Sequence, residues 1–238
     1  MSGTRTRRVL LTRSADDNAE WARELQLRGF IPIECACLEE VRLDDDIDLA
    51  GEFERADWIT CSSRRAVDAL HATARLVPAR IRLAAIGPAT EERMRELFGR
   101  CDCVSSNGSA ADLGAELVRL GARHVMVTAA RGGLFDIERT LMEAGRTATR
   151  IELYEIQPIG GELPIEALDA DIAFFASPSA VRAFAARGSL PSGCTVISIG
   201  PTTTAALRAA GLPVHVESQT RDLHGMISAL ATQSTNER

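Results

Sequence analysis

Lysine is missing from this chain of 238 residues, so all 27 of its basic side chains are arginines. Arginine suits the recognition of carboxylates or phosphates better than lysine does, although a bias in genome composition explains the missing lysines as well. The formal net charge is −6. Because an acidic chain is a poor candidate for extensive nucleic-acid binding, we expect no nucleic-acid partner.

Long apolar segments and common catalytic motifs are also missing from the sequence. No stretch approaches the roughly 18 apolar residues of a membrane span, and the apolar run at residues 9–11 is too short for a secretory signal. We therefore expect a cytoplasmic protein without a membrane partner. The chain has no phosphate-binding Gly-x-x-x-x-Gly-Lys loop, no dinucleotide-binding Gly-x-Gly-x-x-Gly, no His-Glu-x-x-His and no Gly-x-Ser-x-Gly.

Cysteine is present but its spacing is unlike that of a metal site. The six cysteines stand at positions 35, 37, 61, 101, 103 and 194 and form two Cys-x-Cys pairs. Zinc sites usually pair cysteines as Cys-x-x-Cys or place histidines beside them, and this chain does neither. We predict buried thiols, reduced in a cytoplasmic protein, and no metal site.

What the chain does contain is a sequence repeat. The motif Ile86-Gly87-Pro88-Ala89-Thr90 returns as Ile199-Gly200-Pro201-Thr202-Thr203, and Cys61-Ser62-Ser63 returns as Ala176-Ser177-Pro178-Ser179. The opening Val9-Leu10-Leu11-Thr12 likewise resembles Val125-Met126-Val127-Thr128. A unit of about 110 residues is much longer than a solenoid repeat, so the duplication predicts two similar globular lobes.

Each copy of the repeat alternates short apolar runs with helical periodicity. Ser62 and Ser63 can cap a helix, and Gly29 stands where a helix ends. This alternation predicts an α/β fold in which each lobe is a parallel sheet flanked by helices. In the better-defined copy we predict strands at residues 9–12, 31–37, 57–60 and 82–86, and helices at residues 16–28, 64–76 and 89–98.

The repeated motifs stand where predicted strands end and predicted helices begin. Ligands of open parallel sheets bind at the carboxyl ends of the strands, where helix N-termini favour anions. The hydroxyls of Ser63, Thr90, Ser177 and Thr203 can therefore bind an anionic ligand, although helix capping accounts for any one motif by itself. Because both copies keep their hydroxyls, we favour a binding role in a cleft between the lobes.

Tyr154 is the only tyrosine of the chain and ends a predicted strand of the second copy. A phenol at such a place can donate a proton or a hydrogen bond into a cleft. An amphipathic side chain at a domain interface explains the same residue equally well.

In their order and spacing these motifs resemble the uroporphyrinogen-III synthase family over about residues 7–230. The resemblance implies two lobes joined by two strand-like crossings, with the active-site cleft between them. Residues 1–35 and 156–238 would form one lobe and residues 36–155 the other, whereas the repeat alone would divide the chain near residue 118. The segments that carry the resemblance are residues 9–13, 59–67, 86–90, 153–155, 177–181 and 199–203.

The family converts the linear tetrapyrrole hydroxymethylbilane into cyclic uroporphyrinogen III, with loss of water and inversion of the D ring, in haem biosynthesis. It needs neither metal nor cofactor. The resemblance implies that Tyr154 is the catalytic acid and that a set of hydroxyls and an arginine bind the many carboxylates of the substrate. The implied binding residues are Ser63, Thr90, Ser177, Thr202, Thr203 and Arg13, with Arg64 and Arg131 as further candidates.

One departure from the family and two other functions stay open. Relatives often carry a longer loop with a second arginine after Arg131, whereas Gly132-Gly133-Leu134-Phe135 is short and apolar here. A non-catalytic two-lobed module that binds anions or tetrapyrroles for regulation would share the fold, and a sugar-phosphate-binding α/β protein would share the serine-rich turns. We expect a monomer, because no long apolar surface helix requires a partner.

Overall fold

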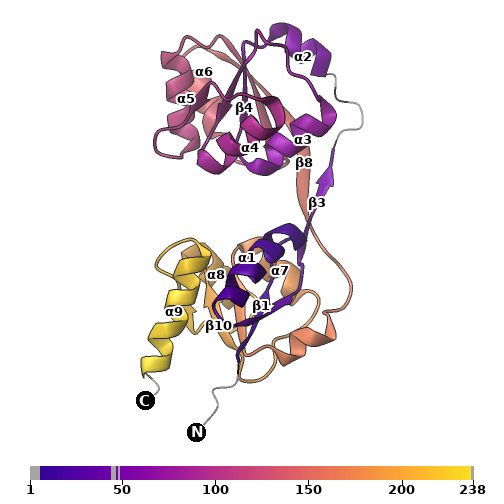
Figure 1. The fold of residues 1–238 in the computed structure, drawn as a ribbon, viewed down its shortest axis with the longest axis vertical. Helices are drawn as coiled ribbons and strands as arrows, with labels where there is room; N and C mark the ends of the chain where they lie inside the picture. The colour runs from indigo at the N-terminus through magenta and orange to yellow at the C-terminus, as the bar shows by residue number, and fades with distance from the viewer. Residues whose placement is uncertain (1–5, 44–46, 48, 237–238) are drawn as a thin grey trace. The chain divides into compact units, whose positions relative to one another are not determined.

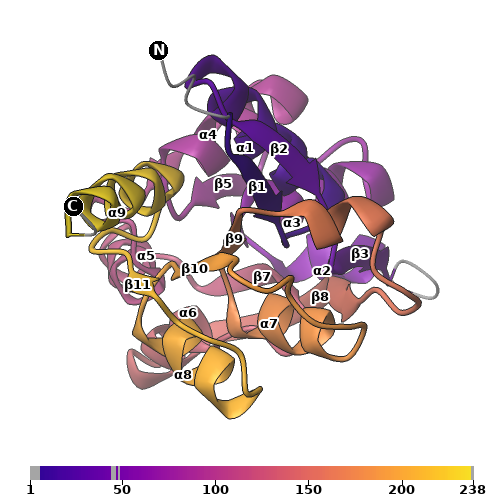
Figure 2. The ribbon, with the colours of Figure 1, turned by 90° about the horizontal axis from the view of Figure 1, so that it is seen from below.

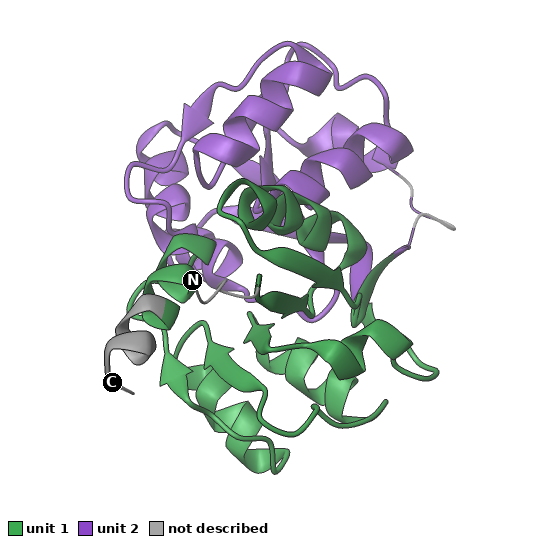
Figure 3. Ribbon diagram, turned by 60° about the horizontal axis from the view of Figure 1, so that its bottom comes forward, with its two compact units in different colours: residues 1–40, 157–238 green, residues 41–156 purple. Residues whose placement is uncertain are grey.

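The chain forms two compact units. The computed structural model describes residues 6–43, 47 and 49–236, the last six of these by their backbone alone. Unit 1 consists of Met1–Glu40 and Gln157–Arg238, and unit 2 consists of Val41–Ile156 (Figure 3). The chain therefore leaves unit 1 and returns to it, and both passages fall inside strands.

Unit 2 is built on a six-stranded sheet with the strand order β3-β8-β7-β4-β5-β6. The β4–β5, β4–β7, β5–β6 and β7–β8 pairs are all parallel. Its elements, most of which are labelled in Figure 1, are β3 (Leu38–Arg42), α2 (Leu49–Arg55), β4 (Trp58–Cys61), α3 (Arg64–Thr73), β5 (Arg82–Ala85), α4 (Pro88–Phe98), β6 (Cys103–Val104), α5 (Ala110–Arg119), β7 (His124–Ala130), α6 (Asp136–Glu143) and β8 (Thr147–Pro158).

Unit 1 is built on a five-stranded sheet with the strand order β11-β10-β9-β1-β2, and all its strand pairs are parallel. Its elements are β1 (Arg8–Leu11), α1 (Ala15–Leu27), β2 (Ile31–Glu34), the 3₁₀ helix η1 (Ile165–Asp169), β9 (Ile172–Phe175), α7 (Pro178–Ala185), β10 (Thr195–Ser198), α8 (Pro201–Ala209), β11 (Val216–Glu217) and α9 (Leu223–Asn236).

Helices cover both faces of each sheet, which confirms the predicted α/β class. In unit 1, α1 and α9 pack on one face and α7 and α8 on the other (Figure 2). In unit 2, α3 and α4 cover one face and α5 and α6 the other. Because both faces are covered, the central strands β4 and β9 are buried along their whole length. Their runs are therefore continuously apolar and do not alternate.

The two units have the same strand arrangement but take it from different parts of the chain. Read from one edge, β2-β1-β9-β10-β11 of unit 1 corresponds to β8-β7-β4-β5-β6 of unit 2. Equivalent threonines make equivalent bonds: the Thr12 hydroxyl donates to the carbonyl of Phe174 at 2.9 Å, and the Thr128 hydroxyl donates to that of Thr60 at 2.7 Å. Each unit thus combines a part of one sequence copy with the complementary part of the other.

Two of the elements predicted in the first copy end three residues earlier in the structure, whereas the other predicted bounds of this copy differ by at most one residue. The strand predicted at residues 31–37 extends only from Ile31 to Glu34, because its partner β1 ends at Leu11. The helix predicted at residues 64–76 ends at Thr73. The next residue, Ala74, already has extended backbone geometry, and its N–H makes the last helical bond, to the Leu70 carbonyl.

The cysteines lie in the apolar interior, as predicted. All six are free and buried. Burial raises the pKa of Cys61 to about 12 and that of Cys101 to about 11. Across the described residues, no helix is both long and apolar enough for a membrane crossing.

Candidate active site

The predicted site residues of unit 2 gather at the carboxyl edge of its parallel sheet. Ser63 follows β4, Gly87 follows β5 and Arg131 follows β7. Because these three strands run in the same direction, their following turns lie along one edge, which is where ligands of such sheets bind. The edge therefore combines three of the turns that the sequence singled out.

Ser63 and Tyr154 are brought into direct contact there. The Ser63 Oγ lies 3.0 Å from the Tyr154 hydroxyl, although the two residues are 91 positions apart. Ser63 also caps α3, because its Oγ accepts a hydrogen bond of 3.1 Å from the backbone N–H of Ala66. The ring of Tyr154 is buried, with 4% of the residue exposed. The phenol is thus held at the sheet edge by a residue that belongs to the helix start.

Tyr154 does not end its strand, contrary to the sequence prediction. β8 continues to Pro158, but its partner β7 ends at Ala130, which pairs with Tyr154 after a register shift of one residue. The backbone N–H of Arg131 donates to the Tyr154 carbonyl at 2.7 Å. Tyr154 therefore lies at the carboxyl edge of the sheet, since the adjacent strand β7 ends beside it.

The Arg131 guanidinium is held by two carboxylates. Its Nε lies 3.3 Å from Glu152 and its Nη1 lies 3.3 Å from Glu155. The loop that follows contains Leu134, with 83% of its surface exposed, and Phe135, with 55% exposed. The expected short apolar loop is present, and the positive charge of Arg131 is shared with acidic side chains of β8.

Thr90 and Thr203 occupy equivalent positions in α4 and α8. Both are buried, with 7% and 1% of their surfaces exposed. Their helices begin at Gly87 and Gly200, neither of which provides a side-chain cap. Proline, which has no N–H, occupies the first position of each helix, and the N–H groups of Thr90 and Thr203 donate to the Gly87 and Gly200 carbonyls. Each first turn therefore leaves the N–H of its second residue, Ala89 or Thr202, for a ligand or solvent. Thr202, beside Thr203, is exposed.

Ser177 repeats the capping geometry of Ser63 in unit 1. Its Oγ accepts a hydrogen bond of 3.1 Å from the N–H of Ala180, and it caps α7 as Ser63 caps α3. It follows β9, while Gly200 follows β10, so both turns lie at the carboxyl edge of the unit 1 sheet. Each unit thus has one serine turn and one Gly-Pro-x-Thr turn at this edge.

Charge at the helix N-termini distinguishes the repeated turns from other helix starts. The first turns of α3, α7 and α8, which the structure describes completely, contain no carboxylate, whereas α4 has Glu91. Of the other helices, α1, α2, α5 and α6 have an acidic residue in the first turn, whereas α9 has none. Because acidic side chains normally stabilise a helix N-terminus, their absence at three of the four repeated turns favours a negatively charged ligand.

Arg13 lies just beyond the carboxyl end of β1 in unit 1. Its guanidinium is 3.3 Å from Asp17 and lies 4.4 Å from the centre of the Trp21 ring. These contacts hold the side chain along α1. Its predicted role in substrate binding stays a prediction.

Arg221 is a candidate that the sequence patterns did not reveal. Its Nε lies 3.9 Å from the position that a Cβ of residue 200 would take, so it flanks the Gly-Pro-x-Thr turn of unit 1. The neighbouring Asp222 is occupied elsewhere, because bonds from the Gly225 N–H and the Thr220 hydroxyl lower its pKa. The pair Asp222-Leu223 matches Asp112-Leu113 of the first copy, but that copy has Ala111 at the position of Arg221.

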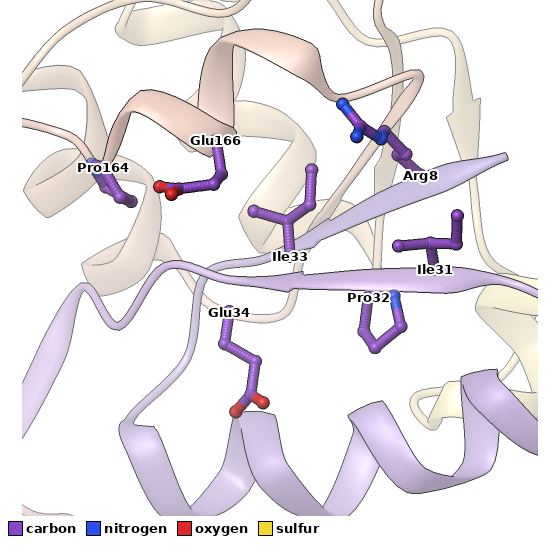
Figure 4. Close-up of a pocket in the computed structure, with 7 residues that line it drawn as sticks. All are labelled: Arg8, Ile31, Pro32, Ile33, Glu34, Pro164 and Glu166. Carbon is purple, nitrogen blue, oxygen red and sulfur yellow. The ribbon is translucent and has the colours of Figure 1, made fainter.

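Other polar features of the described residues lie away from the serine turns and Gly-Pro-x-Thr turns. A pocket of about 290 Å³ lies between β2 and η1 and contains none of the predicted site residues (Figure 4). Its Arg8 pairs with Asp169 at 2.7 Å. Within the described part of the chain, no group of three or more His, Cys, Asp or Glu side chains is arranged to hold a metal ion.

Comparison with known proteins gives one consistent family. The model of the family described as uroporphyrinogen-III synthase HemD matches residues 19–228. A uroporphyrinogen-III synthase from Synechococcus elongatus is 25% identical, over 93% of each chain.

Solved structures of the same name share the fold. The uroporphyrinogen-III synthetase of Helicobacter pylori superposes with a TM-score of 0.66 and 17% identity, over 96% of this chain and 100% of that one. A mutant uroporphyrinogen-III synthase of Thermus thermophilus gives a TM-score of 0.56 and 16% identity, over 97% and 100% of the two chains.

Proposed function

The chain belongs to the uroporphyrinogen-III synthase HemD family, and we propose that it converts hydroxymethylbilane into uroporphyrinogen III, with loss of water and inversion of the D ring. The observation that carries this proposal is the Tyr154 hydroxyl, which lies at the carboxyl edge of a parallel sheet and 3.0 Å from Ser63. It is the single phenol of the chain. It stands among turns that suit an anionic substrate.

In this proposal Tyr154 is the general acid. The phenol donates its proton to the hydroxyl group of the bilane while the carbon–oxygen bond breaks, so that the hydroxyl leaves as water. The electron-poor carbon that remains is then attacked by the other end of the bilane. Free bilane closes without D-ring inversion, so the enzyme must also hold the chain in the geometry that inversion requires.

The repeated turns supply the binding groups for the substrate carboxylates. The N–H groups of Ala89 and Thr202, in the first turns of α4 and α8, can donate to carboxylate oxygens, and Thr202 can add its exposed hydroxyl. We assign Thr90, Ser177 and Thr203 to the same task, because they stand at equivalent turns of the two units. Arg13 adds a positive charge at the edge of unit 1.

Product-isomer analysis tests the proposed function. The purified chain is mixed with hydroxymethylbilane formed in situ by the enzyme that makes it, and the products are separated by chromatography as types I and III. We expect the type III isomer to dominate and its amount to rise with protein concentration. Type I product alone, formed at the rate without protein, would refute the proposal. Binding of bilane without type III formation would instead identify the non-catalytic module.

A further inference from the structure

We propose that Ser63 is a positioning residue that acts through Tyr154: its hydroxyl donates a hydrogen bond to the phenol oxygen and stabilises the phenolate left after proton transfer. This inference rests on the proposed function, because it assigns a task within the proton transfer from Tyr154. It replaces the sequence-based expectation that Ser63 serves to contact the substrate.

The position of the Ser63 hydroxyl is set by the protein and needs no ligand. Ser63 is the N-cap of the ten-residue helix α3, and its Oγ accepts the N–H of Ala66 at 3.1 Å. A serine hydroxyl has two acceptor sites and one donor. The capping bond uses one acceptor site and fixes the oxygen, and it leaves the hydroxyl proton to be directed elsewhere.

The second contact of the Ser63 oxygen is the phenol of Tyr154, at 3.0 Å. While the phenol is neutral, either oxygen can donate in this bond. Once Tyr154 has given its proton to the leaving group, only Ser63 can donate, and a hydrogen bond to an anion is stronger than one between neutral groups. The contact therefore stabilises the state after proton transfer more than the state before it, which is the condition for lowering the barrier.

Charges near this pair favour the same direction of donation. The first turn of α3 is described in full and has no carboxylate, and the helix begins with two arginines. The positive end of the helix therefore lies at Ser63 and favours a negative charge beside it. The acidic neighbours of Tyr154 on β8, Glu152 and Glu155, are both paired with Arg131, which weakens their repulsion of a phenolate.

Unit 1 shows that a serine can cap its helix without a tyrosine beside it. Ser177 caps α7 with the same 3.1 Å bond. The counterpart of Tyr154 there is Leu38, because Leu38 forms a parallel bridge with Ser14 where Tyr154 pairs with Ala130. The same serine cap thus occurs with and without a phenol, and the hydroxyl–phenol pair is specific to unit 2.

A double-mutant cycle in the full-length protein tests this role. The variants are Ser63→Ala, Ser63→Thr, Tyr154→Phe and the double variant of Ser63→Ala with Tyr154→Phe. Ser109→Ala is the matched control, because Ser109 caps α5 of the same unit through the N–H of Asp112 at 3.1 Å. For each protein, kcat and KM for type III formation and the thermal unfolding midpoint are measured.

We expect Ser63→Ala to lower kcat by about 10-fold to 100-fold, the effect of losing a hydrogen bond to a charged group, while KM changes little. Ser63→Thr should restore most of kcat, and Ser109→Ala should leave kcat unchanged at a similar cost in unfolding temperature. In the Tyr154→Phe background the Ser63→Ala substitution should have no further effect on kcat. An equal loss of kcat in both backgrounds, or a change confined to KM, would overturn the proposal.

A titration provides a readout that does not depend on activity. Because Tyr154 is the only tyrosine, the absorbance band of tyrosinate reports the ionisation of this phenol alone. Ser63→Ala should raise the pH at which half of the phenol is ionised, and an unchanged titration would overturn the inference. If Tyr154→Phe kept full activity, the proposed catalytic acid itself would be wrong, so the two failures are distinguishable.

Discussion

Replacement of Tyr154 by phenylalanine should separate catalysis from stability. The substitution removes one oxygen and keeps the buried ring, of which the wild-type residue exposes 4%. The substitution removes the hydrogen bond to Ser63, and the loss of this bond should lower the free energy of unfolding by about 1 kcal/mol. The cap of α3 stays in place, because Ser63 still accepts the N–H of Ala66. The folded structure should therefore be retained.

The effect on the reaction should be far larger than the effect on folding. A positioned general acid contributes about 100-fold to 10,000-fold to a rate, which is about 3 to 5 kcal/mol of barrier. We expect kcat for type III formation to fall by this factor while KM stays near the wild-type value. The assay measures the initial rate of type III product from hydroxymethylbilane, with isomer separation to subtract the spontaneous type I product.

Thr149→Val is the matched control for this experiment. Thr149 lies on the same strand, and its hydroxyl is 2.8 Å from the His124 Nε2. The control therefore also removes a hydroxyl and one hydrogen bond from β8, but away from the sheet edge, and its kcat should equal that of the wild type. Equal kcat values for Tyr154→Phe and the wild type would refute the assignment of Tyr154 as the acid. Equal losses in both variants would show that strand stability controls the rate.

Three further outcomes concern the packing around the site. Arg150→Met should lower the free energy of unfolding by about 3 to 5 kcal/mol in a denaturant titration. The guanidinium lies 2.6 Å from a buried carboxylate of α6, and the substitution leaves this carboxylate without its partner. Wild-type stability of the variant would contradict this prediction. Gly225→Ala should also destabilise unit 1, by about 1 to 3 kcal/mol in the same measurement, because the added methyl would lie 2.8 Å from the Thr220 carbonyl. In alkylation of the native protein followed by mass spectrometry, Cys35 should react before Cys61. Hydrogen bonding from the neighbouring thiol lowers the pKa of Cys35 to about 7, whereas burial raises the pKa of Cys61 to about 12. Simultaneous labelling would show that local opening of the structure controls the reaction of both thiols.

The local structure was predictable because local rules determine it. The alternation of apolar runs with helical periodicity predicted the strands and helices, and Ser63 and Ser177 were recognisable as caps from their place before a helix. Both serines do cap their helices in the structure. The larger errors occurred at element ends, such as that of β2, where the end of the partner strand decides and is not visible in the periodicity of the segment itself.

The contacts within the site depend on the pairing of distant strands, so they could not be predicted from the motifs. Ser63 belongs to the first copy of the repeat and Tyr154 to the second, so a division of the chain between the copies would separate them. Likewise, no local pattern indicated that Glu152 and Glu155 would bind Arg131. These contacts follow from the pairing of β7 with β8 and of β7 with β4, which puts segments far apart in sequence on adjacent strands.

The permuted assembly of the two units explains how a symmetric fold carries an asymmetric reaction. Each unit needs one serine turn, one Gly-Pro-x-Thr turn and a strand pair with a one-residue register shift, and both copies supply these parts. At the shifted position, however, unit 2 has Tyr154 and unit 1 has Leu38. In the proposed function the turns of each unit can bind substrate carboxylates, whereas the proton comes from the phenol of Tyr154. Under the same proposal the duplicated turns account for binding, and one of the positions at which the copies diverge, beside a serine that both keep, accounts for the chemistry.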